Sequence, residues 1–364
     1  MNLHIVPDNV FTNRFYENIV ELGILDKNRI IVRSSSEKYV HIKHDIVGAP
    51  MYSAEFDSYV GDLSQYEKVF IHMFLPLMYR WVAKNSFKEL NWMIWGADLY
   101  NLPTNDLDLY DRLTYKKYVR YKWSLNNLLY LLKIRFTNSI YKKEAYGKVD
   151  NVLTWMTSEF NFACTHLPLS KRVKHKFFFY ENKFAYETLD KYSQEGHATK
   201  SDIPTIIIGN SSTATLNHID VVNYLQENAI KANLLIPVSY GDKHYADFLR
   251  RNLLFYTYGK VELVDRYMAF EEYVTFLMSA DAIIMYNTRP QGYGNIFIMM
   301  YLEKPVILNE KNISVADLDK NSLKWYSISD LQKNRELQVS GNRKAVTELL
   351  SHQRLLKTYS DLFS

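Results

Sequence analysis

The sequence predicts an α/β protein with two halves, and two observations indicate that fold class. Short apolar runs alternate with longer amphipathic stretches through most of the 364 residues, which is the pattern of buried parallel strands in βαβ units. A polar stretch at residues 190–204 separates these runs into two groups, and its composition is typical of a linker. We therefore expect two sheets of parallel strands, one on each side of the linker.

The apolar runs place the strands, and the amphipathic stretches between them place the helices. The strands expected before the linker are Leu3–Val6, Arg29–Val32, Val69–Phe74, Trp92–Trp95 and Phe177–Tyr180. Those expected after it are Thr205–Ile208, Leu234–Val238, Val261–Val264, Ala282–Tyr286 and Val306–Leu308. The helices expected in the second half include Ser211–Ala232, Phe270–Ser279 and Ile296–Leu302. The second of these has apolar residues at helical spacing, as a buried helix face does.

These elements divide the chain into a first domain at residues 1–195, a second at 196–340, and C-terminal helices at 341–364 that pack back on the first domain. Hydrophobic residues make up 47% and charged residues 23% of the sequence, a balance that excludes wholesale disorder. A single cysteine, Cys164, excludes a disulfide framework and a four-cysteine zinc site. We find neither a signal peptide nor a transmembrane run, and we expect a cytoplasmic protein, soluble or peripheral to a membrane.

Two glycine-containing turns in the second half are candidates for binding phosphate. Residues 288–295 (TRPQGYGN) connect a strand to an apolar helix, and Arg289 adds a guanidinium to that turn. Gly209-Asn210-Ser211-Ser212 also follows a strand and precedes a helix, where Ser211 or Ser212 is a natural N-cap. Backbone N–H groups at the start of a helix favour an anion. Each turn alone is also compatible with ordinary strand–helix geometry, but together they favour the diphosphate of a nucleotide.

Two polar side chains in the first half are candidates for acid–base chemistry. Asp98 follows the strand in the stretch Asn91–Tyr100, so we expect it at the carboxyl end of the sheet, in an interdomain cleft. There its carboxylate would act as a general base on an acceptor hydroxyl, and a helix cap is the alternative. His72 is the second candidate, although its apolar strand also suits a structural core histidine.

No metal site is expected. The triplets Asp106-Leu107-Asp108 and Asp317-Leu318-Asp319 have the carboxylate spacing that can hold Mg²⁺ or Mn²⁺, but both lie in polar loops and neither directly ends an apolar strand. Cys164-Thr165-His166 lacks a second pair of ligands. The turn after the first strand also lacks the glycine pattern of a nicotinamide or flavin site.

Basic residues are concentrated between Tyr110 and Lys148. This segment contains ten Lys or Arg residues and two acidic residues, so its net charge is +8, whereas the whole chain has a net charge of +4. The residues expected to face an anionic inner membrane and recruit a lipid-linked acceptor are Lys116, Lys117, Arg120, Lys122 and Trp123. Interleaved Tyr and Trp suit the headgroup region. The alternatives are a helical hairpin with a solvated basic face and nucleic-acid binding, for which no motif is present.

The chain resembles glycosyltransferase family 56, the bacterial N-acetylfucosaminyltransferases of enterobacterial common antigen assembly. The stretches that carry the resemblance are Trp92–Tyr100, Ile206–Ser211, Asn217-His218, Pro237–Tyr240, Phe270–Tyr273, Asp281 and Gln291–Gly294. The resemblance implies a GT-B fold of two facing Rossmann-like domains, with a nucleotide-sugar donor on the second and a lipid-linked saccharide acceptor on the first. It also implies metal-independent transfer at the cytoplasmic face of the inner membrane.

With this resemblance, the candidate residues take roles. The donor, linked to dTDP or UDP, would be held at its diphosphate by Gly209, Asn210, Ser211, Ser212, Arg289, Gln291, Gly292, Gly294 and Asn295. Its nucleoside would contact Tyr240, Phe270, Glu271 and Glu272. Two other functions stay open: a sugar-nucleotide epimerase of the same double fold, which would consume donor without acceptor, and a non-catalytic two-lobed sugar-binding protein.

Overall fold

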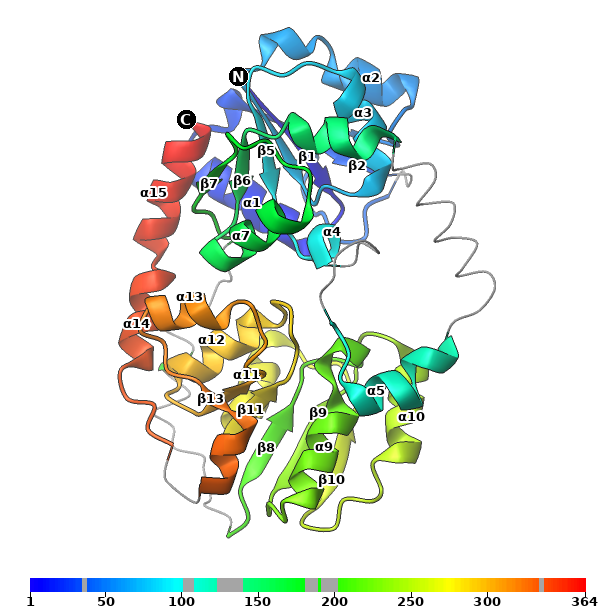
Figure 1. The fold of residues 1–364 in the computed structure, drawn as a ribbon. Helices are drawn as coiled ribbons and strands as arrows, with labels where there is room; N and C mark the ends of the chain where they lie inside the picture. The colour runs from blue at the N-terminus through cyan, green and yellow to red at the C-terminus, as the bar shows by residue number, and fades with distance from the viewer. Residues whose placement is uncertain (35–37, 101–107, 123–139, 181–188, 191–201, 334–336) are drawn as a thin grey trace. The chain divides into compact units, whose positions relative to one another are not determined.

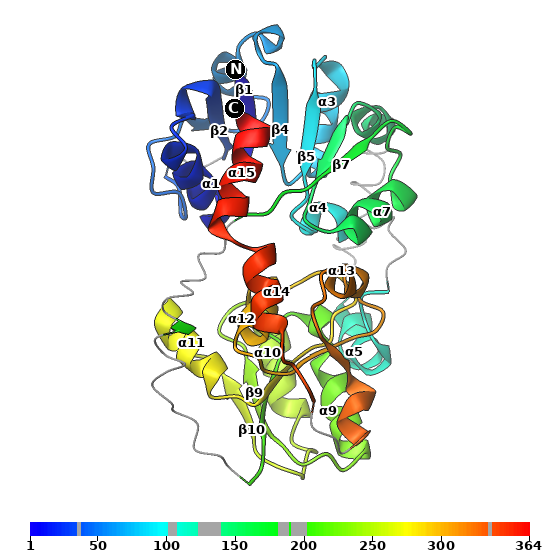
Figure 2. The same ribbon diagram turned by 90° about the vertical axis from the view of Figure 1, so that its left-hand side faces the viewer.

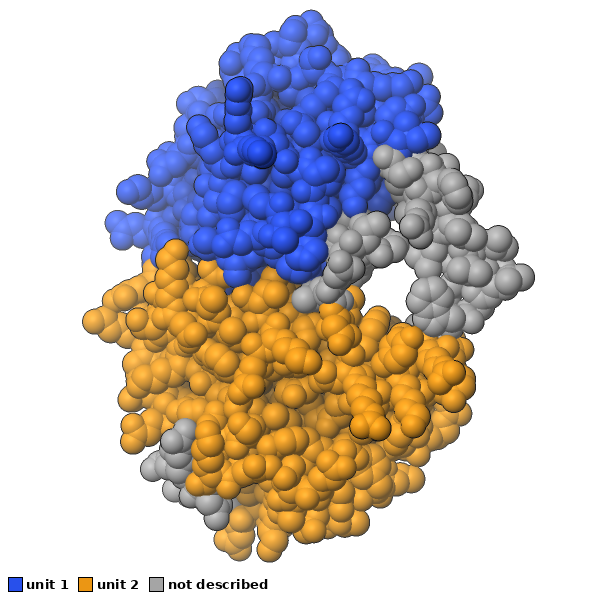
Figure 3. Space-filling model, in the orientation of Figure 1, with its two compact units in different colours: residues 1–106, 125–181, 350–364 blue, residues 107–124, 182–349 orange. Residues whose placement is uncertain are grey.

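The structure is a computed structural model that describes residues 1–34, 38–100, 108–122, 140–180, 189–190, 202–333 and 337–364. It separates into two compact units (Figure 3). Unit 1 contains Met1–Asp106, Leu125–Glu181 and Leu350–Ser364, and unit 2 contains Leu107–Ser124 and Asn182–Leu349. Each unit is built on its own parallel sheet, so the predicted α/β class with two parallel-sheet domains is confirmed.

Unit 1 has a seven-stranded sheet in the order β3-β2-β1-β4-β5-β6-β7. Its strands are β1 (Asn2–Pro7), β2 (Asn28–Arg33), β3 (Gly48–Ala49), β4 (Lys68–His72), β5 (Leu90–Met93), β6 (Asn151–Leu153) and β7 (Lys174–Lys176). All neighbouring strands are parallel. The interior strand β1 is buried along its whole length, as expected of a strand covered on both faces.

The helices of unit 1 whose bounds the structure describes are α1 (Val10–Glu21), α2 (Ala54–Val60), α3 (Tyr79–Lys84), α4 (Ala97–Tyr100), α7 (Thr157–His166) and α15 (His352–Phe363), with 3₁₀ turns η1 (Leu25–Lys27), η2 (Leu63–Gln65) and η3 (Pro76–Met78). The two longest of these helices are α1 and α15, with twelve residues each. The C-terminal helix α15 runs beside α1 (Figure 2). Its buried side chains join the core formed around Phe15 and Phe70, so the last residues of the chain complete a core that the first residues begin.

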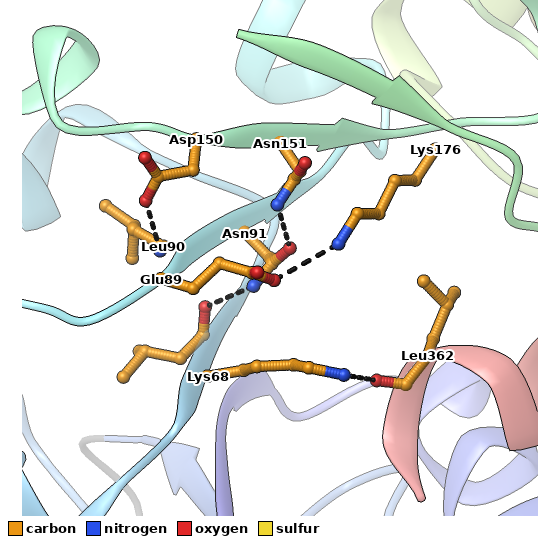
Figure 4. Close-up of polar contacts among 9 residues, drawn as sticks. Lys68, Glu89, Leu90, Asn91, Asp150, Asn151, Lys176 and Leu362 are labelled. Carbon is orange, nitrogen blue, oxygen red and sulfur yellow. Dashed lines mark hydrogen bonds and ion pairs between the residues drawn. The ribbon is translucent and has the colours of Figure 1, made fainter.

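Polar contacts tie the short strands β6 and β7 to the rest of the sheet (Figure 4). The Asn91 side-chain oxygen accepts from Asn151 Nδ2 at 3.0 Å, across the β5–β6 pair. The backbone N–H of Leu90 donates to Asp150 Oδ2 at 2.8 Å. Glu89 and Lys176 form an ion pair of 3.2 Å. Cross-strand pairs of this kind stabilise strands that are too short to bury much apolar surface.

Unit 2 has a six-stranded parallel sheet in the order β10-β9-β8-β11-β12-β13 (Figure 1). Its strands are β8 (Thr205–Ile208), β9 (Asn233–Pro237), β10 (Val261–Val264), β11 (Ala282–Met285), β12 (Val306–Leu308) and β13 (Tyr326–Ser327). Its helices are α5 (Arg112–Lys117), α9 (His218–Glu227), α10 (Lys243–Asn252), α11 (Phe270–Met278), α12 (Tyr293–Tyr301), α13 (Val315–Lys320) and α14 (Asn342–Leu349). Its 3₁₀ turns are η4 (Val119–Lys122), η5 (Ala214–Leu216) and η6 (Ile328–Lys333).

Some elements differ from those that the sequence predicts. The strand expected at Phe177–Tyr180 is β7, three residues earlier, and the apolar residues that follow β7 belong to no strand but pack on the core. The helix expected to start at Ser211 begins at His218, after η5. Strands β3, β6 and β13 were not predicted, because two or three residues carry no recognisable period.

The units also divide the chain differently from the expected domains. Residues 107–124 lie in unit 2, although the sequence analysis assigned them to the first domain. Of the C-terminal helices expected to pack on the first domain, α14 lies in unit 2 and α15 in unit 1. The expected linker falls mostly outside the described residues.

Candidate functional site

The two predicted phosphate-binding turns lie at the topological switch point of unit 2. The chain goes from β8 to β9 and β10 on one side, then returns to β11 on the other side of β8. The loops after β8 and β11 therefore lead to opposite faces of the sheet and leave a crevice at its carboxyl edge, where ligands of such sheets bind. These loops contain Gly209–Ser212 and residues 286–292.

The turn after β8 requires glycine. Gly209 has φ +70°, and a Cβ on it would lie 2.6 Å from His218 Nε2. Its N–H donates to the carbonyl of Ile284 in β11 at 2.8 Å, which fixes the turn against the neighbouring strand. Any larger residue would push the turn away from α9.

Asn210 and Ser212 bind the loop that follows β9. Asn210 Nδ2 donates to the Tyr240 hydroxyl at 2.6 Å. The N–H and Oγ of Ser212 both donate to the Tyr240 carbonyl at 2.9 Å, and Ser211 Oγ shares a bond of 2.8 Å with Thr213 Oγ1. The buried Oδ1 of Asn210 has no hydrogen-bond partner. Ser212 thus has a structural role, whereas Asn210 has hydrogen-bonding capacity left for a ligand.

The turn after β11 meets Asn210 directly. Gly292 is the N-cap of α12, in the left-handed conformation with φ +68°, and no side chain caps this helix end. A Cβ on Gly292 would lie 2.3 Å from Met285 Cε and 3.2 Å from the side chain of Asn210. The glycine therefore lets the start of α12 approach the β8 loop, and the positive end of a helix dipole faces that side.

The other residues predicted to bind the diphosphate of the nucleotide-sugar donor lie around the contact between Gly292 and Asn210. Gln291 Oε1 accepts from Thr215 Oγ1 at 2.8 Å, Gly294 lies in the first turn of α12 and Asn295 is 8% exposed. Arg289 is half-buried in the same loop, and its carbonyl accepts from the side chains of Asn287 and Asn312. The loop is therefore held in one conformation by buried amide side chains.

The predicted nucleoside residues are more exposed. Tyr240 is 57% and Phe270 is 46% exposed. Glu271 and Glu272 lie in the first turn of α11, where Glu272 pairs with Arg266. Tyr273 of the same helix, which the sequence analysis did not select, is close enough to Asn295 for that side chain to influence the pKa of its hydroxyl. Burial raises the pKa of the Tyr273 hydroxyl, so it stays protonated at neutral pH.

His218 and Asn217 are functional candidates that the sequence analysis quoted only for the resemblance. His218 is fully buried under Gly209, with Nε2 lacking a hydrogen-bond partner, and burial lowers its pKa to about 3. Asn217 has φ +52° and donates to the carbonyl of Tyr286 at 3.2 Å, while its oxygen accepts from Asp111 N at 2.9 Å. Neither role is visible in sequence, since each depends on contacts with distant loops.

The described part of the basic segment falls in both units: residues 110–122 pack on unit 2, whereas residues 140–148 belong to unit 1, where Lys148 Nζ donates to the Asn85 carbonyl at 2.9 Å. The Asp220 carboxylate in α9 accepts from the N–H groups of Leu113 and Thr114 at 2.7 and 2.8 Å, and from the Thr114 hydroxyl at 2.7 Å. The Tyr118 hydroxyl donates to Asp242 at 2.8 Å.

A groove of about 800 Å³ opens beside these contacts, and its lining residues are Lys117, Tyr118, Tyr121, His244, Asp247, Phe248, Arg250 and Arg251. Lys116, Lys117 and Arg120 are exposed, Lys122 belongs to η4, and Trp123 lies outside the described residues. The surface is therefore basic and partly aromatic, and it includes α10 as well as the predicted segment.

Asp98 is a buried acceptor of hydrogen bonds in unit 1. Its side chain is 0% exposed. Oδ2 accepts from Phe74 N at 2.8 Å and from Trp92 Nε1 at 2.7 Å, and Oδ1 accepts from Trp95 N at 3.0 Å. Burial raises the pKa of the Asp98 carboxyl. With no exposed surface, it cannot take a proton directly from an acceptor hydroxyl in this conformation.

His72 is fully buried as well and belongs to a hydrogen-bonded chain. Asn28 Oδ1 accepts a hydrogen bond from Asn2 Nδ2 at 3.0 Å, which identifies this atom as the amide oxygen. Because an oxygen of this kind only accepts, His4 Nε2, also at 3.0 Å from it, carries the proton and donates. Burial lowers the pKa of His4 to about 3, so its Nδ1 is an acceptor for His72 Nε2 at 3.2 Å. His72 Nδ1 then accepts from the Tyr180 hydroxyl at 2.5 Å. The pKa of His72 lies well below its usual value because of burial, which makes it a weak base.

The carboxylate triplets do not form a metal site within the described residues. Asp106 lies outside these residues. Asp317 is buried at the start of α13, whereas Asp319 accepts from Trp325 Nε1 at 2.8 Å. In the described part of the chain, no group of three or more His, Cys, Asp or Glu side chains is positioned to hold a metal ion.

Comparisons with known proteins identify the class of this fold. The sequence model of a family described as 4-alpha-L-fucosyltransferase, glycosyl transferase group 56, matches residues 132–351. A glycosyltransferase from Rickettsia africae ESF-5 has 14% identity and a TM-score of 0.57, over 100% of this chain and 97% of that one. Anabaena Alr3699/HepE in complex with UDP has 11% identity and a TM-score of 0.57, over 100% of both chains. α,α-Trehalose 6-phosphate synthase from Burkholderia multivorans has 8% identity and a TM-score of 0.55, over 100% of this chain and 94% of that one.

At these identities the structural likeness shows the fold, which is the GT-B fold of glycosyltransferases. Among the helices that the structure describes, none is both long enough and apolar enough to span a bilayer.

Proposed function

Because the chain belongs to the 4-alpha-L-fucosyltransferase family, glycosyl transferase group 56, we propose that it moves a fucose-like deoxyamino sugar from a nucleoside diphosphate to a lipid-linked saccharide. Membership of this family and the GT-B fold make it a glycosyltransferase. The sugar, the lipid-linked acceptor and a role in surface polysaccharide assembly are the proposed part.

The contact between the β8 and β11 loops carries the proposal. Gly209 and Gly292 both have positive φ, and between them lies Asn210 with an unpartnered, buried side-chain oxygen. The start of α12 is not capped by a side chain, so its dipole and N–H groups favour the donor diphosphate. Tyr240 and Phe270 flank the nucleoside with exposed aromatic faces, and Glu271 or Glu272 binds the ribose or base.

In the transfer, an acceptor hydroxyl oxygen attacks the anomeric carbon, the bond between that carbon and the β-phosphate oxygen breaks, and the hydroxyl proton passes to solvent or to the leaving phosphate. The nucleoside diphosphate leaves with added negative charge. Groups that already point at this charge lower the barrier without having to reorganise. In the proposed site these groups are the first turn of α12 and the guanidinium of Arg289, and they replace a divalent ion.

A thermal-shift panel of UDP, dTDP, GDP and CMP tests the donor site. A nucleotide at 100 times its Kd stabilises the protein by about 2.7 kcal/mol. Gly292→Ala should raise the Kd at least tenfold, since its methyl group would clash with Met285 Cε and crowd the Asn210 side chain, in a backbone conformation of positive φ. Gly341→Ala is the matched control, because that glycine also has positive φ but open space around it. The donor site is wrong if no nucleotide shifts the melting temperature or if both variants weaken binding equally.

Metal-independent transfer has a separate test. Transferase activity should persist in EDTA. The enzyme should consume the nucleotide-sugar donor only when the acceptor is present, whereas an epimerase would consume it without acceptor. Loss of activity in EDTA that Mn²⁺ restores would contradict this part.

The basic surface of α5, η4 and α10 is proposed to hold the protein on the cytoplasmic face of the inner membrane. Each Lys or Arg near an anionic surface adds about 1 kcal/mol, and Tyr121 is 78% exposed among these cations. Sedimentation with anionic liposomes should show binding that falls with salt and with Glu at Lys116, Lys117 and Arg120. Glu at the exposed Lys231, Lys260 and Lys320, also in unit 2, is the matched control. If wild-type protein ignores anionic liposomes at low salt, the membrane role is wrong.

A further inference from the structure

Arg33 lies across the switch point of unit 1. It is the last residue of β2 and pairs with Pro7, the last residue of β1. Its Nη2 donates to the carbonyl of Met73, just after β4, at 3.2 Å. Because β1 lies between β2 and β4 in the sheet, the guanidinium passes over the carboxyl end of β1. The chain leaves β1 toward β2 on one side and returns to β4 on the other, so this is the ligand-binding edge of the sheet.

The Arg33 guanidinium uses few of its five N–H donors. Among the described residues, the guanidinium donates one hydrogen bond, to Met73, and its buried Nε has no partner there. Across the described residues, no carboxylate forms an ion pair with Arg33. Burial lowers the pKa of Arg33 to about 10, so it is charged at neutral pH. A half-buried cation without an anion is costly, which indicates that the position serves a ligand.

The titratable groups whose pKa values are coupled to Arg33 already have other contacts. The Asp98 carboxylate raises the pKa of Arg33 through its charge, but the hydrogen bonds recorded for its oxygens come from Phe74, Trp92 and Trp95. The charge of Arg33 also helps to lower the pKa of His72. Asp98 and His72 are 0% exposed, whereas Arg33 is partly exposed. Arg33 is therefore the member of this group that can reach a bound molecule.

We propose that Arg33 binds an oxyanion of the acceptor, a phosphate or a carboxylate, at the carboxyl edge of unit 1. The planar guanidinium offers paired N–H donors that match either group. Met73 orients the guanidinium, and Asp98 limits the local excess of positive charge. That the molecule is the acceptor rests on the proposed function; binding of an oxyanion by Arg33 does not.

Isothermal titration of the full-length chain tests this with two pairs of soluble probes. Geranyl diphosphate against geraniol represents a lipid phosphate, and methyl glucuronide against methyl glucoside represents a sugar carboxylate. Wild-type protein should bind the anionic member of at least one pair, and the arm that binds identifies the source of the oxyanion. Arg33→Gln should weaken that binding about tenfold or more, and Arg33→Lys should weaken it less, since it keeps the charge without the fork.

Arg29→Gln is the matched control, because Arg29 lies on the same strand at its amino end and is also half-buried. The thermal shift of each variant with the best nucleotide shows whether unit 2 is intact, and it tests the donor site independently. The proposal is overturned if wild-type protein binds neither anionic probe, if Arg33→Gln binds as wild type does, or if Arg29→Gln loses binding equally.

Discussion

Replacing Asp98 with Asn separates a structural role from a catalytic one. The carboxylate accepts three hydrogen bonds, from Phe74 N, Trp92 Nε1 and Trp95 N, at 2.8, 2.7 and 3.0 Å. Asparagine offers one acceptor oxygen and an NH₂ group that only donates. In its best orientation the oxygen keeps the bonds to Phe74 and Trp92, and the NH₂ group faces the N–H of Trp95.

The expected cost follows from that unpaired donor. A buried N–H without an acceptor costs about 1–3 kcal/mol, so Asp98→Asn should lower the free energy of unfolding of unit 1 by about that amount at pH 7. Burial raises the pKa of Asp98 in the folded protein. The stability associated with its proton is present at low pH and is lost as pH rises through the folded pKa. The difference in the free energy of unfolding between the wild-type protein and Asp98→Asn should therefore become smaller from pH 4 to pH 7.

Urea unfolding followed by tryptophan fluorescence measures this, because four of the six tryptophans, Trp81, Trp92, Trp95 and Trp155, lie in unit 1. Asp150→Asn is the control: Asp150 is exposed and accepts one bond from Leu90 N, so its free energy of unfolding should change by less than about 0.5 kcal/mol. Unchanged stability of Asp98→Asn together with a large drop in kcat would refute the structural interpretation and support the general-base role.

Three further outcomes are expected. His4 and His218 are neutral in the folded protein, with pKa values of about 3, and the pKa of His72 is also lowered. The stability that these neutral histidines contribute to the folded protein is present above pH 6.5 and is lost as pH falls. At pH 4.5 His4 and His218 should each lower the free energy of unfolding by roughly 2–3 kcal/mol, and a flat urea-unfolding profile from pH 7 to 4.5 would contradict this. Asp220→Ala should release the start of α5 and lower stability by about 1–2 kcal/mol, seen as faster amide exchange there; unchanged protection would refute it. Deleting residues 352–364 should unfold unit 1 while nucleotide binding by unit 2 persists, and equal loss of both would be the contrary result.

The sequence predicted the sheets well where strands are long and buried. The runs at Thr205–Ile208 and Ala282–Met285 are strands, as their continuous apolar character indicates. Strand β6 could not be predicted, since its three residues are held by side-chain contacts from Asn91 and Asp150. Such contacts depend on residues about sixty positions away, which no local pattern reveals.

The candidate site was predictable only in part for the same reason. Glycine turns after strands have a local signal, and the structure brings Gly209 and Gly292 to one edge. The burial of Asp98 has only a partial signal: its donors Trp92 and Trp95 lie within six residues of it, but its third donor, Phe74 N, follows another strand. The association of α5 with unit 2 likewise depends on Asp220, more than a hundred residues later. The sequence analysis did not select Arg33, because an arginine at the end of a strand is usually exposed to solvent. Only its partial burial in the structure distinguishes it.

The C-terminal helix makes the folding of unit 1 depend on the end of the chain. The Phe363 carbonyl accepts from Asn2 Nδ2 and Asn28 Nδ2, and the Leu362 carbonyl accepts from Lys68 Nζ, at 2.7–3.1 Å (Figure 4 shows the contact of Lys68). These donors sit at the amino ends of β1, β2 and β4, where they satisfy the carbonyls that every helix leaves at its C-terminus. The sheet of unit 2, by contrast, comes from one continuous stretch, residues 205–327. Since domains fold as units during synthesis, unit 2 can complete its core before unit 1, although most of unit 1 is made first.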